Sequence, residues 1–430
     1  MNFYLISLGC AKNLVDSEKI AGFLTKAGYR ITDSIEDASF IFINTCGFIK
    51  EAKQESIDTI LSVLQEKPEG SGLAVYGCLV QRYLNELKEL LPEVDLFLPV
   101  LPYQEVVKEI KKLFPLQPDH KAGVQKQVLF TPPSYTYIKI ADGCRNRCSY
   151  CAIPLIRGPL KSFPAEDIVH QINGALNNGV YEINLIAQDI TAYGIDLYGK
   201  PSLPLLLKSI LSIKKDFRIR LLYLYPIIIT YELIRIIKSD PRIVKYLDIP
   251  VQHANSRILK LMNRPYTKDD LTKKIALLRE KIPSVVLRTS LIVGFPTESE
   301  EDFQELTDFV RQTRFDHLGV FEYSPEEDTK AFFLRPSVPV AIRKKRKRIL
   351  MEIQKNIVKE KNKALKGKIF PCLMELSIDE YGAVWTGRIY SQAPEVDGLV
   401  YVTGYETKMG KVVNVKIRKY KDYDFYGECV

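Results

Sequence analysis

The 430-residue chain contains no apolar run that approaches the roughly 18 residues of a membrane-spanning helix, so we expect no part of it to cross a membrane. Its first apolar stretch is too short and too uncharged for a secretory signal peptide. Neither an internal repeat nor a low-complexity segment is present. Without a signal peptide, the eight cysteines indicate the reducing cytoplasm, where clustered thiols bind metals more often than they form disulfides.

The composition is that of an ordinary soluble globular protein, with 46% hydrophobic and 26% charged residues. A chain of this length is expected to form about three domains. The net charge of +9 is mildly basic and suggests no more than an anionic partner.

Three cysteines lie close together in the sequence, at Cys144, Cys148 and Cys151. Three thiolates at this spacing can bind three corners of an iron–sulfur cube, which leaves the fourth iron free for a small molecule. A zinc site or a redox disulfide is the alternative. Zinc sites usually combine two CxxC-like halves, and no second half lies nearby, so the sequence favours the iron–sulfur interpretation.

From residue 1 to 117, short apolar runs alternate with helical patterns, which predicts an open α/β domain. Its predicted strands at 3–7, 40–44 and 73–77 are each followed by a cysteine, namely Cys10, Cys46 and Cys78. Because the carboxyl ends of parallel strands form the crevice where such sheets bind ligands, the three thiols are expected to converge. Buried cysteines are also ordinary core residues, but those should fall inside strands and not just past them. We therefore predict a second three-cysteine iron–sulfur site.

The rest of the chain is predicted to contain a linker at 118–134 and two further domains. Between 135 and 365, strands alternate with helices, which predicts a partial (β/α)6 barrel with the close cysteine triplet after its first strand. The strands are expected at 135–140, 181–187, 218–224, 246–250, 285–293 and 316–323. From 366 to 430, five short strands separated by glycine-containing turns predict a small OB-like β-barrel.

The triplet, with Tyr150 before its last cysteine, resembles the signature of the radical S-adenosylmethionine enzymes. Over essentially its whole length the chain resembles the methylthiotransferases of that superfamily, which combine an N-terminal cluster domain, a radical core and a C-terminal TRAM domain. The likeness is carried by residues 7–18 (SLGCAKNLVDSE), 187–194 (AQDITAYG), 248–254 (DIPVQHA) and 392–398 (QAPEVDG). The first and last of these resemble the ribosomal-protein branch, RimO, more than the tRNA branch, MiaB.

This resemblance implies S-adenosylmethionine and two [4Fe-4S] clusters, each on one cysteine trio, as cofactors. The core cluster would generate a 5′-deoxyadenosyl radical and the second would carry sulfur. The implied product is a methylthio group on the β-carbon of an aspartate in the decoding-centre ribosomal protein of the small subunit. A low-potential electron donor of the flavodoxin or ferredoxin type is also implied. The alternatives are a tRNA adenosine methylthiotransferase and, from another class, a non-catalytic iron–sulfur protein that binds RNA.

The charge of the last domain favours a protein substrate. Residues 366–430 contain nine basic and nine acidic side chains, so their net charge is zero. A domain that binds tRNA should carry a positive excess to neutralise phosphates.

Six residues outside the cysteines are expected to contact the cofactor: Tyr150, Gln188, Arg288, Val293, Gly294 and Phe295. The alternatives are that Arg288 is a member of a buried ion pair and that Gly294 serves only a turn. His253 is interpreted equally well as a contact residue or as a hydrogen-bonded structural histidine. The basic run at 343–348 is either the solvated face of a helix or a contact with ribosomal RNA.

Overall fold

The computed structural model describes residues 1–116, 128–379, 382–404 and 407–430. The chain forms two compact units, one of Met1–Phe130 with Cys151–Pro159 and one of Thr131–Tyr150 with Leu160–Val430. The chain therefore passes from the second unit to the first inside the cysteine triplet. Residues 118–127 of the predicted linker lie outside the described residues, and the predicted domain boundaries stay predictions.

The first unit is built on a parallel five-stranded sheet with strand order β2-β1-β3-β4-β5. Its strands are β1 (Asn2–Ser7), β2 (Arg30–Ile31), β3 (Phe40–Thr45), β4 (Gly72–Gly77) and β5 (Leu96–Leu98). The predicted open α/β architecture is confirmed. The two edge strands, β2 and β5, are not predicted from the sequence, because two or three residues carry too little periodicity.

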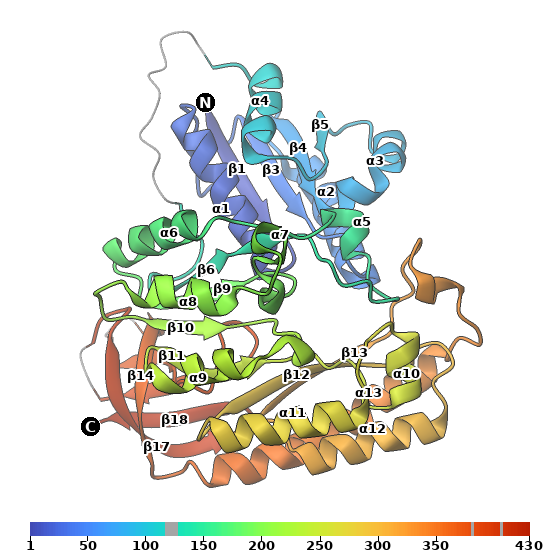
Figure 1. Ribbon diagram of the computed structural model, residues 1–430. Coiled ribbons are helices and arrows are strands. Elements are labelled where there is room, and N and C mark those ends of the chain that lie inside the picture. Colours follow the sequence, from blue (N-terminus) through green and yellow to red (C-terminus); the bar gives the residue numbers. More distant parts are fainter. Residues whose placement is uncertain (117–127, 380–381, 405–406) are drawn as a thin grey trace. The chain divides into compact units, whose positions relative to one another are not determined.

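Helices cover both faces of this sheet (Figure 1). They are α1 (Ala11–Lys26), α2 (Lys50–Glu66), α3 (Cys78–Leu90), α4 (Tyr103–Leu113) and the short α5 (Ile153–Arg157), which packs against α3. Side chains alternate along β3, so that Phe42 packs with α1 and α4 while Ile41 and Ile43 pack with α2 and α3. Burial on both faces explains why β3 and β4 are apolar along most of their length.

The second unit contains the predicted partial barrel, a six-stranded parallel sheet with sequential order β13-β12-β11-β10-β9-β6. The strands are β6 (Tyr135–Lys139), β9 (Glu182–Ile186), β10 (Arg218–Leu221), β11 (Ile243–Asp248), β12 (Val286–Val293) and β13 (His317–Glu322). A two-stranded ribbon of β7 (Ala141–Asp142) and β8 (Lys161–Ser162) flanks the cysteine triplet.

The helices of this unit lie along one side of the curved sheet (Figure 1). The longer ones are α6 (Ala165–Asn177), α8 (Leu203–Leu211), α9 (Tyr231–Ser239), α11 (Lys268–Lys281), α12 (Glu300–Thr313) and α13 (Val340–Lys363); α7 (Ile195–Tyr198) and α10 (Ser256–Leu261) are short. Helix α12 begins with a capping box in which Ser299 and Asp302 bind each other's backbone N–H groups.

The last strands close into a five-stranded barrel in the order β14-β15-β16-β18-β17, which confirms the predicted OB-like domain. They are β14 (Ile369–Ser377), β15 (Val384–Arg388), β16 (Val400–Thr403), β17 (Val412–Lys421) and β18 (Asp424–Cys429). Cys372 is fully buried in the core of this barrel.

A buried charge network joins this small barrel to the six-stranded sheet. Glu182 at the start of β9 is fully buried and pairs with Arg220 of β10 (Oε1 to Nε, 3.3 Å) and with Arg218. It also pairs with Arg388 of the small barrel (Oε1 to Nη1, 2.9 Å), which in turn binds Glu375 (2.6 Å). Burial alone would raise the pKa of Glu182, but the three arginines hold it well below its usual range.

The branch-specific segment 392–398 makes a second part of this junction. Asp397 accepts a hydrogen bond from the Tyr246 hydroxyl of β11 at 2.7 Å and lies 3.1 Å from His317 Nδ1 of β13. Arg288 of β12 pairs with Asp397 (3.6 Å) and with Asp248 (3.5 Å). This segment therefore holds the small barrel against the sheet.

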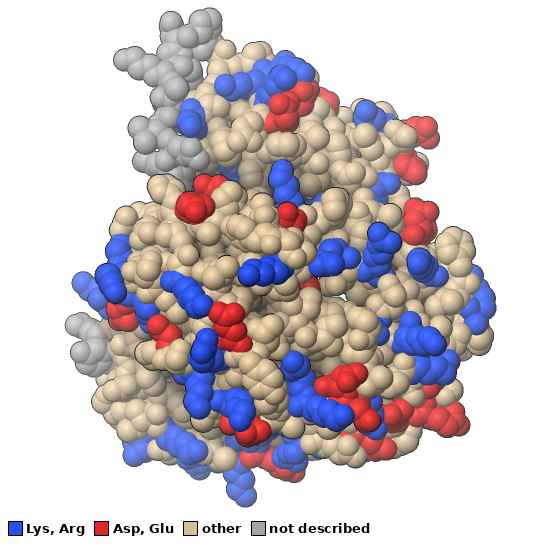
Figure 2. All heavy atoms as spheres, viewed as in Figure 1, with Lys and Arg blue, Asp and Glu red and all other residues tan. Residues whose placement is uncertain are grey.

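Within the described ranges, no helix has both the length and the apolar character needed to cross a membrane. Figure 2 shows Lys and Arg side chains interspersed with Asp and Glu over the face drawn, which agrees with the modest net charge of +9.

Candidate metal centres

Three cysteines of the first unit follow three neighbouring strands at the same edge of its sheet. Cys10 comes three residues after β1, Cys46 directly follows β3 and Cys78 directly follows β4. The strands are in register at this edge, with Ser7 opposite Asn44 and Thr45 opposite Gly77. The geometry thus brings together the three loops that the sequence analysis expected to converge.

Two glycines let these loops approach one another. A Cβ on Gly9 would lie 2.7 Å from the Cβ and 3.0 Å from the Sγ of Cys46, so the residue before Cys10 packs directly on Cys46. A Cβ on Gly47 would lie 2.8 Å from the carbonyl oxygen of Cys78. Neither position has room for a side chain, because protein atoms do not approach this closely.

Two of the three thiols lie at helix N-termini, and two are buried. Cys10 is the N-cap of α1 and Cys78 is the first residue of α3, and a helix N-terminus stabilises negative charge. Burial raises the pKa of the Cys46 thiol to about 12 and also raises that of Cys78. A nearby positive charge or metal is therefore needed to hold these sulfurs as thiolates.

No group of three His, Cys, Asp or Glu side chains surrounds a single ion position in the part of the chain that the structure describes. In an iron–sulfur cube each cysteine binds a different iron, so its ligands need not approach one another as the ligands of one ion do. The three-thiol donor set is one that an iron–sulfur cube can use, and the cube stays a prediction here.

Asn13 touches all three cysteine loops and was not identified from the sequence. Its side chain is 1% exposed, and its Nδ2 donates to the carbonyls of Leu8 (3.0 Å) and Thr45 (3.2 Å), which precede Cys10 and Cys46. Its Oδ1 lies 3.6 Å from Cys78 Sγ. A single amide thus fixes the spacing of the three loops.

Arg157 of α5 is a second residue that the sequence analysis missed. Its Nη2 donates to Cys78 Sγ (3.2 Å) and to Asn13 Oδ1 (2.9 Å), while its Nη1 binds Asp16 Oδ2 (2.6 Å). The other oxygen of Asp16 accepts a hydrogen bond from the Tyr103 hydroxyl at 2.7 Å. These contacts join distant segments, so no local motif could have revealed them.

The close triplet begins in the second unit, in the loop after β7. Cys144 and Cys148 lie there, whereas Cys151 is the first residue of the segment that belongs to the first unit. Burial raises the pKa of the Cys144 thiol to about 11. Asn146, between Cys144 and Cys148, donates to Asp189 Oδ2 at 2.8 Å and so fixes the loop to the end of β9.

Gln188 lies beside the same loop. Its Nε2 donates to Asp142 Oδ1 at 3.2 Å, and Asp142 directly precedes Gly143 and Cys144. Its Oε1 is buried with no hydrogen-bond partner among the described residues. An orphaned buried oxygen at this position fits the polar ligand that the sequence analysis expected, because such atoms normally have a partner.

The loop that carries Tyr150 is held by the segment after α10. Ser149 donates its backbone N–H to Met262 O (3.0 Å) and its hydroxyl to Leu261 O (2.7 Å). The Tyr150 hydroxyl accepts a hydrogen bond from Arg264 Nη2 at 2.8 Å. Arg264 is buried and lies over the ring of Tyr225, with its carbon Cζ 4.8 Å from the ring centroid.

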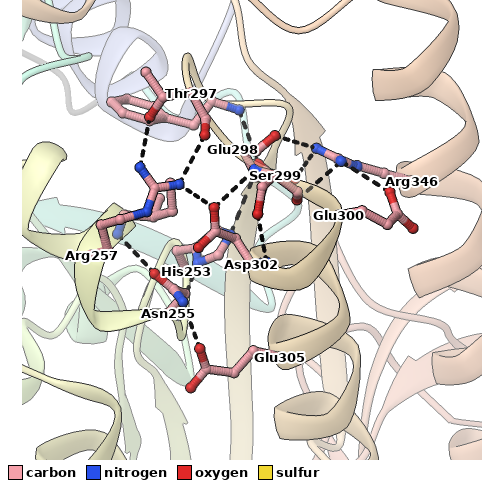
Figure 3. A network of polar contacts seen from close by, with 12 residues as sticks. His253, Asn255, Arg257, Thr297, Glu298, Ser299, Glu300, Asp302, Glu305 and Arg346 are labelled. Atoms are coloured by element: carbon pink, nitrogen blue, oxygen red, sulfur yellow. Dashed lines mark hydrogen bonds and ion pairs between the residues drawn. The ribbon is translucent and has the colours of Figure 1, made fainter.

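The predicted segment 293–295 begins at the last residue of β12 and is held by the polar network in Figure 3. The backbone N–H of Phe295 donates to Glu298 Oε2 (3.0 Å), and Glu298 Oε1 pairs with Arg346 of α13 (2.8 Å). Gly294 has φ +71°, and a Cβ there would overlap the Arg343 side chain. The space above Gly294 is thus filled by α13, and the glycine is required by the turn and by this packing.

His253 lies in the same network and has the structural role that the sequence left open. It is fully buried, and its Nδ1 accepts a hydrogen bond from the Asn255 backbone N–H at 3.0 Å. Burial lowers the pKa of His253 to about 3, which keeps the ring neutral. Burial likewise raises the pKa of Glu298 to about 7, and the Arg346 guanidinium opposes this rise.

Two further predicted roles are modified by the structure. Arg288 is a member of the buried ion pairs with Asp248 and Asp397, which was the alternative interpretation of that residue. In the basic run, Arg346 is buried and Arg343 donates to the Tyr323 carbonyl (2.6 Å). The other four members, 344, 345, 347 and 348, are exposed, so the solvated-face interpretation fits them, and a contact with RNA stays a prediction.

Three family descriptions match successive parts of the chain. Residues 2–99 match the uncharacterized protein family UPF0004, residues 138–310 match the radical SAM superfamily and residues 367–430 match the TRAM domain.

Full-length relatives were also found. The chain is 45% identical to the ribosomal protein uS12 methylthiotransferase RimO of Acetivibrio thermocellus, over 99% of this chain and 98% of that protein. It is 45% identical to the RimO protein of Thermodesulfovibrio yellowstonii, over 100% of both chains. Among solved structures, the radical S-adenosylmethionine methyltransferase TsrM of Kitasatospora setae is similar with a TM-score of 0.55, 11% identity, and coverage of 75% of this chain and 73% of that chain. At that identity the likeness shows the fold alone.

Proposed function

Because the chain belongs to the RimO family of radical S-adenosylmethionine methylthiotransferases, we propose that it methylthiolates the β-carbon of an aspartate in the decoding-centre ribosomal protein of the small subunit. The observation that carries this proposal is the second cysteine trio. Cys10, Cys46 and Cys78 lie in three converging loops of the first unit, separate in sequence from the close triplet of Cys144, Cys148 and Cys151. A radical enzyme that only abstracts hydrogen needs one cluster, whereas sulfur insertion requires a site that holds sulfur.

The cofactors proposed are S-adenosylmethionine and two [4Fe-4S] clusters, one on each trio. When bound, they would supply radical hydrogen abstraction, which no acid or base of the protein can perform at an unactivated C–H bond, together with the sulfur and the methyl group. The protein's residues orient these groups. Asn146 and Asp189 hold the core loop, and Arg264 fixes the Tyr150 hydroxyl beside it. Gln188 presents an unpaired oxygen to the same region.

The remaining predicted cofactor contacts also belong to this proposal. Val293 and Phe295 are fully buried on either side of Gly294. We expect them to contribute to cofactor binding by holding the backbone after β12 in one conformation, which the Glu298–Arg346 pair also stabilises. Arg288 would act indirectly, through the two carboxylates that it pairs.

The partners proposed are the ribosomal protein substrate and a low-potential flavodoxin- or ferredoxin-type donor, and a ribosomal substrate places the reaction in the cytoplasm. The neutral net charge of residues 366–430 supports a protein substrate over tRNA. The exposed lysines and arginine of α13 are the candidate contact with ribosomal RNA.

The test is mass spectrometry of the ribosomal protein after anaerobic incubation with the reconstituted enzyme, S-adenosylmethionine and a low-potential reductant. We expect a methylthio group on one aspartate. A variant with Cys10, Cys46 and Cys78 all replaced by alanine should still cleave S-adenosylmethionine but add no sulfur. Methylthiolation of a tRNA adenosine in place of the aspartate would establish the alternative function.

A further inference from the structure

Arg157 places a buried positive charge on one sulfur of the N-terminal trio. Its side chain is 3% exposed, and Asp16, which pairs with it, is fully buried. Its Nη2 lies 3.2 Å from Cys78 Sγ, within the distance of a hydrogen bond to sulfur. Arg157 is only six residues after Cys151 in the chain, so the segment that ends the core triplet also supplies a donor to the other trio.

Arg157 makes more hydrogen bonds than an ion pair with a purely structural role would require. A pair that merely fixed α5 to α1 would be complete with Asp16, whose carboxylate binds Nη1 at 2.6 Å. Here Nη2 is directed instead to Asn13 Oδ1 (2.9 Å) and to the sulfur, and Asn13 is itself fixed by the loops that precede Cys10 and Cys46. The planar guanidinium is thus oriented by two buried partners so that a third bond reaches Cys78.

The surroundings of Cys78 make this contact effective. Cys78 is 6% exposed and packs against Ala152 and Ile156 of the segment that contains α5. Little water can reach the sulfur, so a charged hydrogen bond is screened weakly there. Hydrogen bonds and positive charge at a ligating sulfur stabilise the reduced, more negative state of an iron–sulfur cluster and raise its reduction potential.

We propose that Arg157 is a positioning residue that orients the Cys78 thiolate and raises the reduction potential of the N-terminal cluster. This inference rests on the proposed function, since it requires a cluster on Cys10, Cys46 and Cys78. It assigns to the segment after the core triplet a direct influence on the electronic state of the second cluster.

The experiment isolates that cluster. In a protein with Cys144, Cys148 and Cys151 replaced by alanine, the N-terminal trio is the remaining cluster site. Its midpoint potential is measured by a redox titration followed by electron paramagnetic resonance, with and without Arg157→Gln. We expect Arg157→Gln to lower the potential by about 59 mV, which corresponds to about a tenfold change in a one-electron equilibrium. The matched control is Arg30→Gln, which removes the same charge from an exposed position on β2, and it should leave the potential unchanged.

The outcomes separate the two proposals. If the triple-alanine protein binds no iron, the second cluster is absent and the proposed function fails. If it binds iron but Arg157→Gln leaves the potential unchanged, only the inference about Arg157 is overturned. If Arg157→Gln retains too little iron to titrate, Arg157→Met decides. Methionine is unbranched and adaptable but has neither the charge nor a donor, so its potential should also fall, and an unchanged potential would overturn the inference.

Discussion

Replacing Glu182 by glutamine should loosen the small C-terminal barrel from the six-stranded sheet. Glu182 is fully buried and is the shared partner of Arg218, Arg220 and Arg388. The neutral glutamine amide would remove the carboxylate that the three guanidiniums share. Among the ion pairs of this network, that between Arg388 and Glu375 would remain. Removing one member of a buried ion pair costs about 3–5 kcal/mol, because the remaining charge is desolvated without compensation. At about 1.4 kcal/mol per tenfold, the open state should become about 10³ times more populated.

The pH dependence provides a second signature. The pKa of Glu182 is well below its ordinary value of 4.5 in the folded protein, so the folded state binds fewer protons than the unfolded state as the solution is acidified. The stabilisation by Glu182 is therefore fully present above about pH 4.5 to 5 and is lost as the pH falls toward the folded pKa. The Glu182→Gln protein should lack this acid-dependent component.

Hydrogen exchange followed by mass spectrometry measures the opening directly, because it reports local stability in a chain whose global unfolding is not two-state. The peptide that covers residues 392–398 should exchange much faster in Glu182→Gln. The matched control is Glu232→Gln, since Glu232 pairs with Lys208 at 2.7 Å but both side chains are about half exposed. That change should cost at most about 1 kcal/mol. If both variants changed protection equally little, the network would contribute no net stability and the reasoning would be refuted.

Other substitutions test the candidate sites. Asn13→Ala removes the amide that joins the three cysteine loops and should weaken iron binding at the N-terminal trio by about 10- to 100-fold, measured as iron content after gel filtration with the core triplet intact. Gly47→Ala should destabilise the same loops by about 1–3 kcal/mol because the new Cβ would collide with the Cys78 backbone; unchanged thermal stability and iron content would contradict this. Arg264→Gln should remove the hydrogen bond from Arg264 Nη2 to the Tyr150 hydroxyl and weaken S-adenosylmethionine binding about tenfold, measured by calorimetry on the reconstituted enzyme, whereas Tyr150→Phe should reproduce most of the loss.

The sequence was sufficient for the elements with strong periodicity. The six strands of the core and the five of the small barrel were predicted because each is several residues long and bounded by turn residues. The convergence of Cys10, Cys46 and Cys78 was predictable because parallel strands end at one edge, and the register of β1, β3 and β4 bears this out.

The supporting residues could not be predicted in the same way. Arg157 is 79 residues from Cys78, and Arg388 is 206 residues from Glu182. Such contacts depend on how distant elements pack together. Local propensity and residue spacing contain no information about that packing, so they could not predict these contacts. The role of Gly294 shows a related limit. The sequence revealed a glycine after a strand, but not that α13 occupies the space its missing side chain leaves.

The path of the backbone through the cysteine triplet has a practical consequence. Because Cys151–Pro159 packs with Met1–Phe130, a fragment that ends at Phe130 would leave the wall around Cys78 uncovered. A fragment that begins at Thr131 would in turn expose Ile156, which is 3% accessible in the intact chain. The first unit is thus assembled from two separate segments of the chain, so a polypeptide that ends at Phe130 should be recovered in folded form only when it is co-expressed with one that carries Cys151–Pro159.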